Sequence, residues 1–390
     1  MRIGLITAFD IDDLHSFSGS GYFMASALRR HAGEIEVIRV RRPAWQQKVD
    51  WLLERLVRRL PLRLPWRPPV AFGSAAARHQ ARTAIAAGQF DVLIAFLSSA
   101  EAASLPPGNR PPLVFMSDAT YDLVRGYYDF ASDLPAAADA WYERTEAGAI
   151  ANADLCIYPT SWAAASAISH YGKPAAATAI VPYGANLLEI PAAAEVLDRR
   201  SGPLSRQPRV LLMAKGDFRR KADNILGILD SAIAQGVDLQ LTVCGFRDRP
   251  DISHPNLEFI PYLDKKKPED RRRMHELYWN ADFFLLPTRA DTFGIVFCEA
   301  MAYGLPVITT RTGGVPNVVN DGVTGLILDV DAPPEQFAAA IAGLVADQDR
   351  RRAMATAGRA DYDLRLNWDA FGKSIAGHLE RLVAEAKGKR

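Results

Sequence analysis

The sequence predicts two doubly wound α/β domains. Three observations lead to this fold class: a length of 390 residues, strand patterns that alternate with helical patterns, and one proline-rich break near the middle. A chain of this length exceeds one ordinary hydrophobic core, which favours two domains. Apolar residues make up 49% of the chain and charged residues 23%, as in ordinary soluble globular proteins.

Twelve apolar, β-rich runs are candidate strands. Six lie in the first half: Arg2–Ala8, Glu36–Arg39, Val92–Phe96, Leu113–Met116, Leu155–Pro159 and Ala179–Pro182. Six lie in the second half: Arg209–Ala214, Gln240–Cys244, Leu257–Ile260, Phe283–Pro287, Pro306–Thr309 and Gly325–Leu328. Several runs are continuously apolar, which indicates strands buried on both faces of a parallel sheet. Helical patterns between them, such as Tyr22–His31, Asp139–Ala151 and Ile225–Gln235, complete the α/β alternation.

The alternation breaks once, at Leu187–Pro208, where three prolines occur and no strand pattern is found. We interpret this stretch as the connection between two Rossmann-like domains, residues 1–190 and 191–367. After Trp368, four apolar residues at helical spacing predict a C-terminal helix: Phe371, Ile375, Leu379 and Leu382. Its length suits a helix of residues 368–390 that packs back on the first domain.

Charge, cysteines and hydropathy exclude several classes of protein. The net charge of +1 favours neither nucleic acid nor membrane as a partner of the whole chain. Cys156, Cys244 and Cys298 are far apart, so a disulfide scaffold or zinc knuckle is not indicated, and reduced thiols in a cytoplasmic protein fit best. The N-terminal apolar run is too short for a signal peptide, and no apolar stretch approaches the ~20 residues that span a bilayer.

Two carboxylates lie on one apolar segment between Thr288 and Gly314. Asp291 follows a strand, and Glu299 comes eight residues later on a predicted helix, Phe293–Tyr303. Eight residues at about 1.5 Å rise place the carboxylates roughly 12 Å apart, within a quarter turn of each other. A diphosphate can lie at the helix N-terminus, and the two acids can accept hydroxyls from a sugar and a ribose. Taken singly, Asp291 is equally consistent with a helix N-cap and Glu299 with a solvated helix residue.

The whole segment resembles the signature of the family-four retaining glycosyltransferases, which have the GT-B fold. Their pattern is Glu-x7-Glu with Phe-Gly-Ile or Phe-Gly-Leu after the first acid, followed by Glu-Ala-x-Ala-x-Gly-x-Pro-Val and Gly-Gly. Asp291 stands where the first Glu is usual, and Asn317 where a Glu is common. The remaining positions match: Phe293, Gly294, Ile295, Glu299, Ala300, Ala302, Gly304, Pro306, Val307, Gly313 and Gly314. The resemblance implies that Asp291, Thr292, Phe293, Gly294 and Ile295 hold a donor sugar and that Glu299 holds the ribose.

A basic loop follows the first strand of the second half. Lys215, Arg220 and Lys221 come just after the strand, where open α/β sheets bind ligands, and they can neutralise a diphosphate leaving group. A solvated basic loop is the alternative. The similar family has Arg-x5-Lys here, so Lys221 matches the lysine and Lys215 replaces the arginine.

Three further motifs occur in the first half. Gly19 and Gly21 precede a helix, but Met24 occupies the third glycine position of a dinucleotide fingerprint, which argues against an NAD site. The resemblance places these glycines near the donor phosphates or the acceptor, and a plain turn is the alternative. Ser117 and Asp118 end a strand; Asp118 is a candidate for orienting donor or acceptor, or forms an Asx turn. Asp10–Asp13 resembles an Asp-x-Asp metal site, but we favour a solvated loop, since its basic or aromatic neighbours do not resemble a nucleotide pocket and GT-B relatives generally need no metal.

We therefore expect a retaining glycosyltransferase that moves a sugar from a nucleoside-diphosphate donor to a glycan, lipid-linked or small-molecule acceptor, with no cofactor, metal or nucleic acid. Asp291, Lys221 and Asp118 are the expected catalytic residues. A nucleotide-sugar epimerase, a phosphorylase and a non-catalytic nucleotide-sugar binder remain alternatives.

Residues 43–67 have the pattern of a basic amphipathic helix. Trp45, Val49, Leu52, Leu56 and Leu60 recur on one stripe, and Arg55, Arg58 and Arg59 fall off it. Such a helix suits peripheral contact with an anionic membrane, and packing on the first domain is the alternative.

Overall fold

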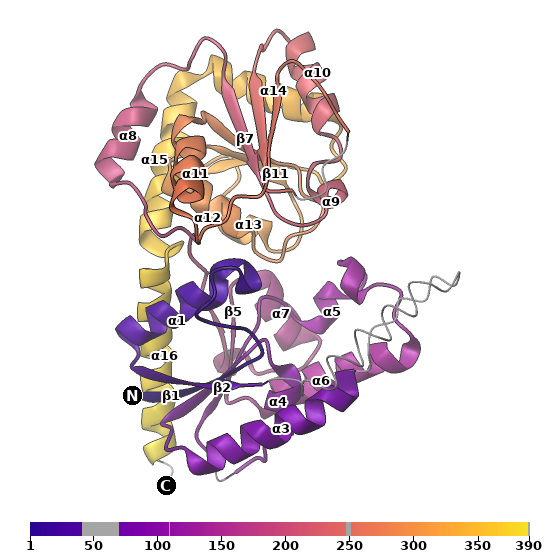
Figure 1. The fold of residues 1–390 in the computed structure, drawn as a ribbon, viewed down its shortest axis with the longest axis vertical. Helices are drawn as coiled ribbons and strands as arrows, with labels where there is room; N and C mark the ends of the chain where they lie inside the picture. The colour runs from indigo at the N-terminus through magenta and orange to yellow at the C-terminus, as the bar shows by residue number, and fades with distance from the viewer. Residues whose placement is uncertain (41–69, 109, 247–250, 389–390) are drawn as a thin grey trace. The chain divides into compact units, whose positions relative to one another are not determined.

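The computed structural model describes residues 1–40, 70–108, 110–246 and 251–388. They form two compact units: the first comprises residues 1–17, 21–181 and 372–390, and the second residues 18–20 and 182–371. Each unit contains one six-stranded parallel sheet flanked by helices (Figure 1). The predicted α/β fold with two doubly wound sheets is confirmed.

The sheet of the first unit has the strand order β2-β1-β3-β4-β5-β6. Its strands are β1 (Arg2–Thr7), β2 (Glu34–Arg39), β3 (Val92–Phe96), β4 (Leu113–Met116), β5 (Leu155–Tyr158) and β6 (Thr178–Ile180). Its helices are α1 (Ser20–His31), α3 (Val70–Ala87), α4 (Ser99–Ser104), α5 (Tyr121–Val124), α6 (Ala136–Asn152) and α7 (Ser161–Ser169). Strands β3, β4 and β5 are buried at every position, as their continuous apolar sequences predict.

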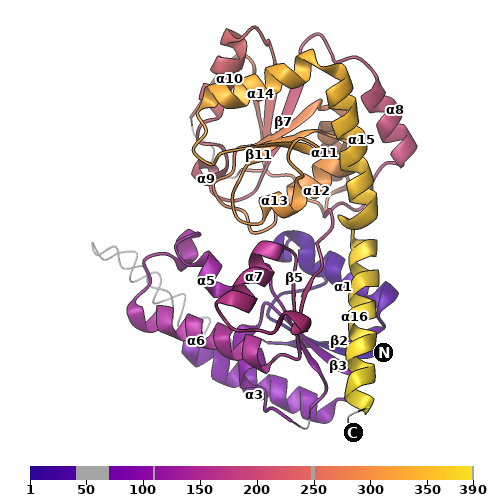
Figure 2. The same cartoon turned by 180° about the vertical axis from the view of Figure 1, so that it is seen from behind.

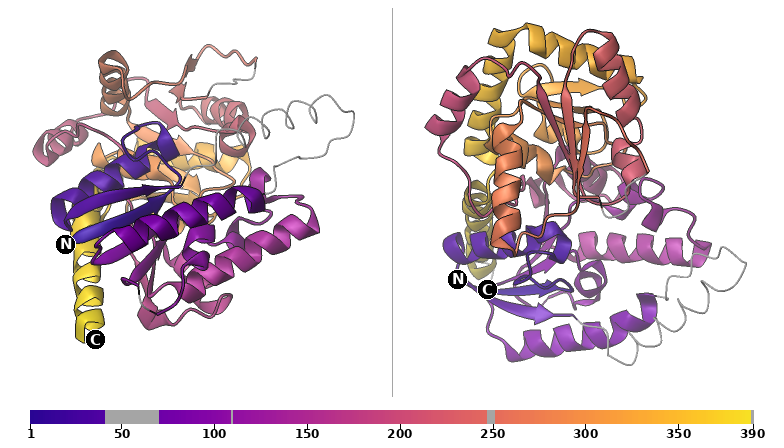
Figure 3. Two further views of the ribbon diagram at one scale, coloured as in Figure 1. Left: turned by 60° about the horizontal axis from the view of Figure 1, so that its bottom comes forward. Right: turned by 45° about the horizontal axis from the view of Figure 1, so that its top comes forward.

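The C-terminal helix α16 (Trp368–Gly388) belongs to this unit from Gly372 onward. It approaches α1 closely, since a Cβ on Gly372 would lie 2.7 Å from the His31 ring and 2.9 Å from the Ala27 carbonyl oxygen. Lys387 Nζ lies 3.9 Å from Asp91 Oδ1, and the Arg2 backbone N–H donates to Asp91 Oδ2 at 2.8 Å. Arg2 and Lys387 therefore both lie near Asp91, and Figure 3 shows the N and C markers on the same side of the first unit.

The sheet of the second unit has the order β12-β11-β10-β7-β8-β9. Its strands are β7 (Arg209–Met213), β8 (Gln240–Cys244), β9 (Leu257–Ile260), β10 (Phe283–Leu286), β11 (Val307–Thr310) and β12 (Gly325–Leu328). Its helices are α8 (Ala193–Ser201), α9 (Phe218–Ala222), α10 (Ile225–Ala234), α11 (Pro268–Asn280), α12 (Ile295–Ala302), α13 (Val315–Val318), α14 (Pro334–Ala346) and α15 (Gln348–Arg365). Figure 2 shows α14 and α15 on the side of this sheet that is turned away in Figure 1.

All twelve predicted strands occur, with ends within two residues of the prediction. The predicted connection Leu187–Pro208 contains helix α8, anchored by buried Val196. The predicted basic helix at 43–67 lies outside the described residues. Among those that are described, no helix combines the length and the apolar character needed to cross a membrane.

Candidate active site

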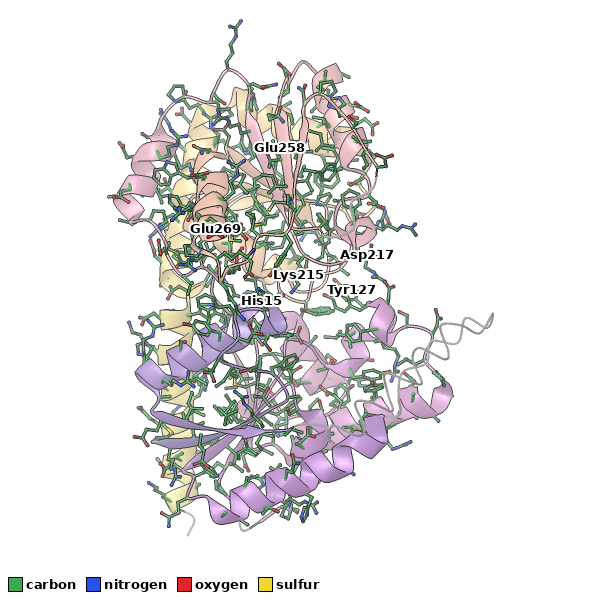
Figure 4. All side chains as sticks on the ribbon, in the orientation of Figure 1. His15, Tyr127, Lys215, Asp217, Glu258 and Glu269 are labelled. Carbon is green, nitrogen blue, oxygen red and sulfur yellow. The ribbon has the colours of Figure 1, made fainter. Side chains whose placement is uncertain are left out.

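The candidate site lies where the strand order of the second sheet reverses. Strand β7 pairs with β8 on one side and β10 on the other, so the loops after β7 and β10 emerge side by side. In open α/β sheets, ligands bind at this position, outside the carboxyl ends of the strands. Figure 4 shows Lys215 and Asp217 at this end of the strands, whereas Glu258 lies further along the sheet. The loop after β7 contains Lys215, the following helix α9 contains Lys221, and the loop after β10 contains Asp291.

Lys221, on helix α9, and Asp291, in the loop after β10, form an ion pair. Lys221 Nζ lies 2.5 Å from Asp291 Oδ2, and the two side chains are 14% and 17% exposed. The same ammonium donates to Thr288 Oγ1 at 3.1 Å and to the Ala290 carbonyl oxygen at 2.8 Å. Asp291, Thr288 and Ala290 thus fix the ammonium group of Lys221 at the end of β10. A cation fixed in this way can stabilise negative charge on a ligand without first having to be ordered.

The backbone that carries Asp291 is tied to both neighbouring loops. Gly314 N–H donates to the Asp291 carbonyl oxygen at 3.1 Å, and Arg289 N–H donates to the Arg220 carbonyl oxygen at 2.8 Å. Thr312 Oγ1 donates to the Arg289 carbonyl oxygen at 3.1 Å. The glycine pair that ends the signature therefore lies against the loop of Asp291, although 22 residues separate Asp291 from Gly313.

Helix α12 begins two residues later than the sequence predicts. Gly294 has φ +86° and precedes the first helical residue, Ile295. A Cβ at Gly294 would lie 2.4 Å from the Phe297 ring, so both the backbone angle and the space require glycine. Asp291 lies three residues before this N-cap, so the interpretation of Asp291 as the helix N-cap is wrong. Phe293 is buried, with its ring 5.4 Å from that of Tyr183.

Glu299 is buried and has one partner on each carboxylate oxygen, so its interpretation as a solvated helix residue is also wrong. It is 2% exposed; its Oε1 lies 3.0 Å from Lys265 Nζ, and its Oε2 accepts a hydrogen bond from Tyr278 at 2.8 Å. Burial and the charge of Glu299 raise the pKa of Tyr278, which keeps the phenol protonated as a donor. Sequence reasoning missed both partners. Lys265 follows β9 closely, and the rule that selected Lys215 also selects it.

Lys265 extends this contact to Asn186. Its ammonium donates to the Asn186 carbonyl oxygen at 2.7 Å. The Asn186 amide donates to the Ser18 carbonyl oxygen and Ser20 Oγ, both at 3.0 Å, and its Oδ1 accepts from Trp368 Nε1 at 3.0 Å. Asn186 thus anchors residues 18–20, which include Gly19, to the second unit.

Gly19 and Gly21 fall in different units. Gly19 has φ +93° and belongs to the second unit, whereas Gly21 lies in the first turn of α1 and belongs to the first unit. Phe17 and Ser18, just before, also have positive φ, at 48° and 58°. Such angles are costly outside glycine and persist where the surroundings enforce them, often at ligand sites. The short 3-10 helix Ser16–Gly19 before α1 therefore has a strained backbone.

Lys215 and Arg220 occupy the loop and helix after β7. Lys215 is exposed, and its ammonium lies 5.7 Å from the centre of the Tyr262 ring, in the loop after β9. Arg220 is half-buried on α9, whose first turn is capped by the Asp217 side chain accepting from Arg219 N–H at 3.0 Å. Both cations thus border the same end of the sheet as Lys221.

Asp118 lies in the first unit, after β4. The neighbouring Ser117 hydroxyl donates to the Ala119 carbonyl oxygen at 2.7 Å, and Asp118 is half-buried. Beneath it on α6, burial raises the pKa of Glu146 to about 7; the charges of Asp118 and Glu143 add to this effect, and a 2.6 Å hydrogen bond from Ser99 opposes it. Asp118 therefore acts electrostatically on a buried carboxyl, Glu146, that the sequence did not reveal.

The Asp10–Asp13 loop has basic neighbours from distant segments. Arg39 Nη2 lies 3.0 Å from Asp10 Oδ1 and 3.4 Å from Asp12 Oδ2, and Arg29 contacts Asp12 at 3.4 Å. Strand β2 supplies Arg39 and helix α1 supplies Arg29. In the described parts of the chain, no group of three or more His, Cys, Asp or Glu residues is arranged to hold a metal ion.

Comparison with known proteins gives matches in both halves of the chain. Residues 22–187 match the family model "Glycosyltransferase Family 4", and residues 199–361 match "Glycosyl transferases group 1". The chain is 29% identical over 191 residues to the D-inositol 3-phosphate glycosyltransferase of Corynebacterium kroppenstedtii, covering 46% of this chain and 38% of that protein. It is 38% identical over 106 residues to a GDP-mannose-dependent alpha-(1-6)-phosphatidylinositol monomannoside mannosyltransferase of Mycobacterium tuberculosis, covering 25% and 27%. The matches thus span less than two thirds of these relatives.

Two solved structures are similar in fold over nearly the full length of this chain. Sucrose-phosphate synthase from Thermosynechococcus elongatus has a TM-score of 0.71 at 19% identity, with 99% of this chain and 100% of that chain covered. WaaG, a glycosyltransferase involved in lipopolysaccharide biosynthesis, has a TM-score of 0.60 at 18% identity, with 97% and 99% covered. Identities this low show the fold alone. Together with the family matches, they place the chain in the group 1 glycosyltransferases with the GT-B fold.

Proposed function

We propose that this glycosyltransferase moves a sugar from a nucleoside-diphosphate donor to an acceptor hydroxyl, with retention of the anomeric configuration. The observation that carries the proposal is the Lys221–Asp291 pair at 2.5 Å, at the point where the second sheet reverses its strand order. The pair brings a fixed cation together with a hydroxyl acceptor, and a sugar diphosphate needs both groups.

The second unit supplies the donor contacts in this proposal. Lys221, with Arg220 or Lys215, neutralises the diphosphate, while Asp291 and the backbone of Phe293–Ile295 hold the sugar. Glu299 accepts the ribose hydroxyls. A carboxylate offers about four acceptor positions, and Lys265 and Tyr278 occupy one on each oxygen, so Glu299 keeps capacity for a ribose.

The proposed reaction needs no enzymic nucleophile. The acceptor oxygen bonds to the anomeric carbon on the face that the diphosphate leaves, and the bond from that carbon to the diphosphate oxygen breaks. The released diphosphate oxygen takes the acceptor proton, and Lys221 stabilises the negative charge that develops on it. Because no metal takes part, we expect activity to persist in EDTA.

The donor is identified by a thermal-shift panel of UDP-, GDP- and ADP-sugars. A donor at 100 times its Kd adds about 2.7 kcal/mol to the free energy of unfolding. The named relatives suggest two first choices, GDP-mannose as donor and D-inositol 3-phosphate as acceptor. NMR of the product then reports the anomeric configuration.

Three outcomes contradict the proposal. An inverted product overturns retention, and interconversion of the donor sugar without acceptor indicates an epimerase. A donor that binds but is never transferred or hydrolysed indicates a binding protein.

The sequence predicts that residues 43–67 form a basic amphipathic helix that contacts an anionic membrane. Such contact would suit an acceptor that is linked to a lipid. Flotation with vesicles rich in anionic lipid should recover the native protein at low salt and release it at high salt. Changing Arg55, Arg58 and Arg59 to Ser should abolish this recovery. A native protein that stays unbound at low salt would leave only the packing explanation for this stretch.

A further inference from the structure

A cavity at the amino ends of the central strands of the second sheet, opposite the candidate active site, is rich in arginine. Its volume is about 390 Å³, and it is lined by Arg199 and Arg200 at the end of α8, Arg209 at the start of β7, and Arg351 on α15. We call it the arginine cavity. The five residues of β7, at about 3.3 Å each, place it roughly 16 Å from the loop of Lys215. It is therefore separate from the candidate active site.

The lining has a large excess of positive charge. Four arginines and one acidic residue, Asp282, line the cavity. Asp282 Oδ2 already accepts hydrogen bonds from the Arg209 backbone N–H at 2.8 Å and from Ser205 Oγ at 3.3 Å. Within the ranges that the structure describes, none of the four arginines forms an ion pair.

Arg351 is buried and Arg200 is half-buried, and backbone carbonyl groups hold both guanidinium groups. Arg200 donates to the carbonyl oxygens of Ala281 at 2.6 Å and Tyr303 at 2.9 Å, and Arg351 donates to that of Leu344 at 3.1 Å. Such bonds cap the ends of helices, which is the simplest role for these two residues. These hydrogen bonds fix the guanidinium groups, but a carbonyl oxygen carries only a partial negative charge and does not neutralise them. Consistent with this, burial lowers the pKa of Arg351, and it lowers the pKa of Arg200 to about 10.

The other two arginines are exposed. The guanidinium groups of Arg199 and Arg209 make no hydrogen bond to another residue that the structure describes. They lie on the segments that lead into and out of the loop held by Asp282. The cavity therefore combines fixed cations inside with adaptable cations that can close on a ligand.

We propose that the arginine cavity binds a small phosphate-class oxyanion, either inorganic phosphate or a phosphate monoester. Guanidinium groups match phosphate oxygens in a planar, two-bond geometry, and several of them favour a dianion over chloride. The volume lies at the lower end of the range for small-molecule pockets, so the ligand is small. This site goes beyond sugar transfer and does not depend on it.

Isothermal titration of the full chain with inorganic phosphate tests the site. The native protein should bind, and the Arg199→Ser/Arg209→Ser variant should bind at least about tenfold more weakly because two charged contacts are lost. Arg206→Ser is the matched control, since Arg206 is exposed on the same loop but does not line the cavity, and it should bind as the native protein does. Lys221→Ala should also retain phosphate binding, because Lys221 lies beyond the carboxyl end of β7, whereas the cavity lies at the start of that strand.

Four results would overturn the proposal: no phosphate binding by the native protein, undiminished binding by the double variant, an equal loss in Arg206→Ser, or loss in Lys221→Ala. Both substituted arginines of the double variant are exposed, so its unfolding temperature without phosphate should match that of the native protein. Arg209→Glu provides a second variant, and it should weaken binding further than Arg209→Ser. Titration with glycerol 3-phosphate decides between the two ligand sources, because a monoester site binds it more tightly than phosphate.

Discussion

The ammonium of Lys265 lies 3.0 Å from the carboxylate of Glu299, a residue 34 positions away in the chain. The same ammonium donates to the Asn186 carbonyl oxygen, whose residue anchors residues 18–20 and Trp368. The proposed ribose acceptor is thus joined, through one lysine, to the segment that holds Gly19. A donor whose ribose binds Glu299 alters the contacts between Glu299, Lys265 and Asn186. Loss of these contacts should therefore change both the affinity for the donor and the free energy of unfolding.

Replacing Glu299 by Gln should weaken donor binding more than turnover. A ribose contact is equally strong in the ground state and the transition state, so its loss raises KM and largely spares kcat. The free energy of unfolding should fall by about 1–3 kcal/mol, because Lys265 and Tyr278 lose their charged partner. Kinetics and urea unfolding measure both effects. A double-mutant cycle with Lys265→Met should give a coupling energy above about 0.5 kcal/mol, and simple additivity would contradict the pair.

Lys221→Ala should lower kcat by about 10²–10³, the usual effect of removing one preorganised stabilising donor. Arg219→Ala is the matched control, since Arg219 is exposed on the same helix and its side chain makes no hydrogen bond or ion pair with another described residue. Steady-state kinetics with the native donor measure both variants. Equal losses in the two would show that α9 contributes only general positive charge.

Asp291→Asn should reduce kcat more than it changes KM, because Asp291 lies beside the reacting sugar in the proposed complex. It also removes the charge that pairs with Lys221 at 2.5 Å. Asp291→Glu restores the acid that is usual in the similar family and should retain much of the activity. If Asp291→Asn and Asp291→Glu lose activity equally, then catalysis depends on the geometry of the loop at Asp291 and not on the presence of a carboxylate.

Stability should depend on pH through Glu146. Its pKa is raised by burial from 4.5 to about 7, so the folded state binds its proton more tightly than the unfolded state does. Its contribution is fully present below about pH 4.5 and is lost progressively as the pH rises to about 7. At about 1.4 kcal/mol per pKa unit, the loss is at most about 3 kcal/mol.

Glu146→Gln should therefore be more stable than the native protein at pH 8 and gain nothing at pH 4.5. Urea unfolding at several pH values measures this difference. Glu195→Gln is the control, because Glu195 is exposed on α8, and it should leave the pH dependence unchanged. An unchanged pH profile for Glu146→Gln would show that this carboxyl is not the titrating group.

Gly294→Ala should damage both stability and donor binding. Alanine at φ +86° is strained, and its Cβ would overlap the Phe297 ring at 2.4 Å. Gly322→Ala is the matched control, since φ there is +75° but a Cβ would meet nothing within 4 Å. The control should lose about 1 kcal/mol from backbone strain alone, and Gly294→Ala clearly more. Equal losses would mean that the ring moves aside at little cost.

Local patterns in the sequence determined the architecture. Strands such as Val92–Phe96 and Phe283–Leu286 are continuously apolar because parallel strands are buried on both faces, and the alternation with helices requires parallel connections. The same reasoning located Lys221 and Asp291, because both follow strand ends and ligands collect there. Each of these features depends on a few consecutive residues, so the chain itself reveals it.

Only the tertiary structure decided which side chains meet. Lys221 pairs with Asp291 because β7 lies beside β10, although β8 and β9 separate them in the chain. Glu299 is buried because α11 and the loop after β9 place Tyr278 and Lys265 against α12, whereas the sequence left a solvated position open as an alternative. The arginine cavity draws on α8, β7 and α15. Strand order and helix packing bring distant segments together through their combined burial, and that information is not contained in any single stretch of sequence.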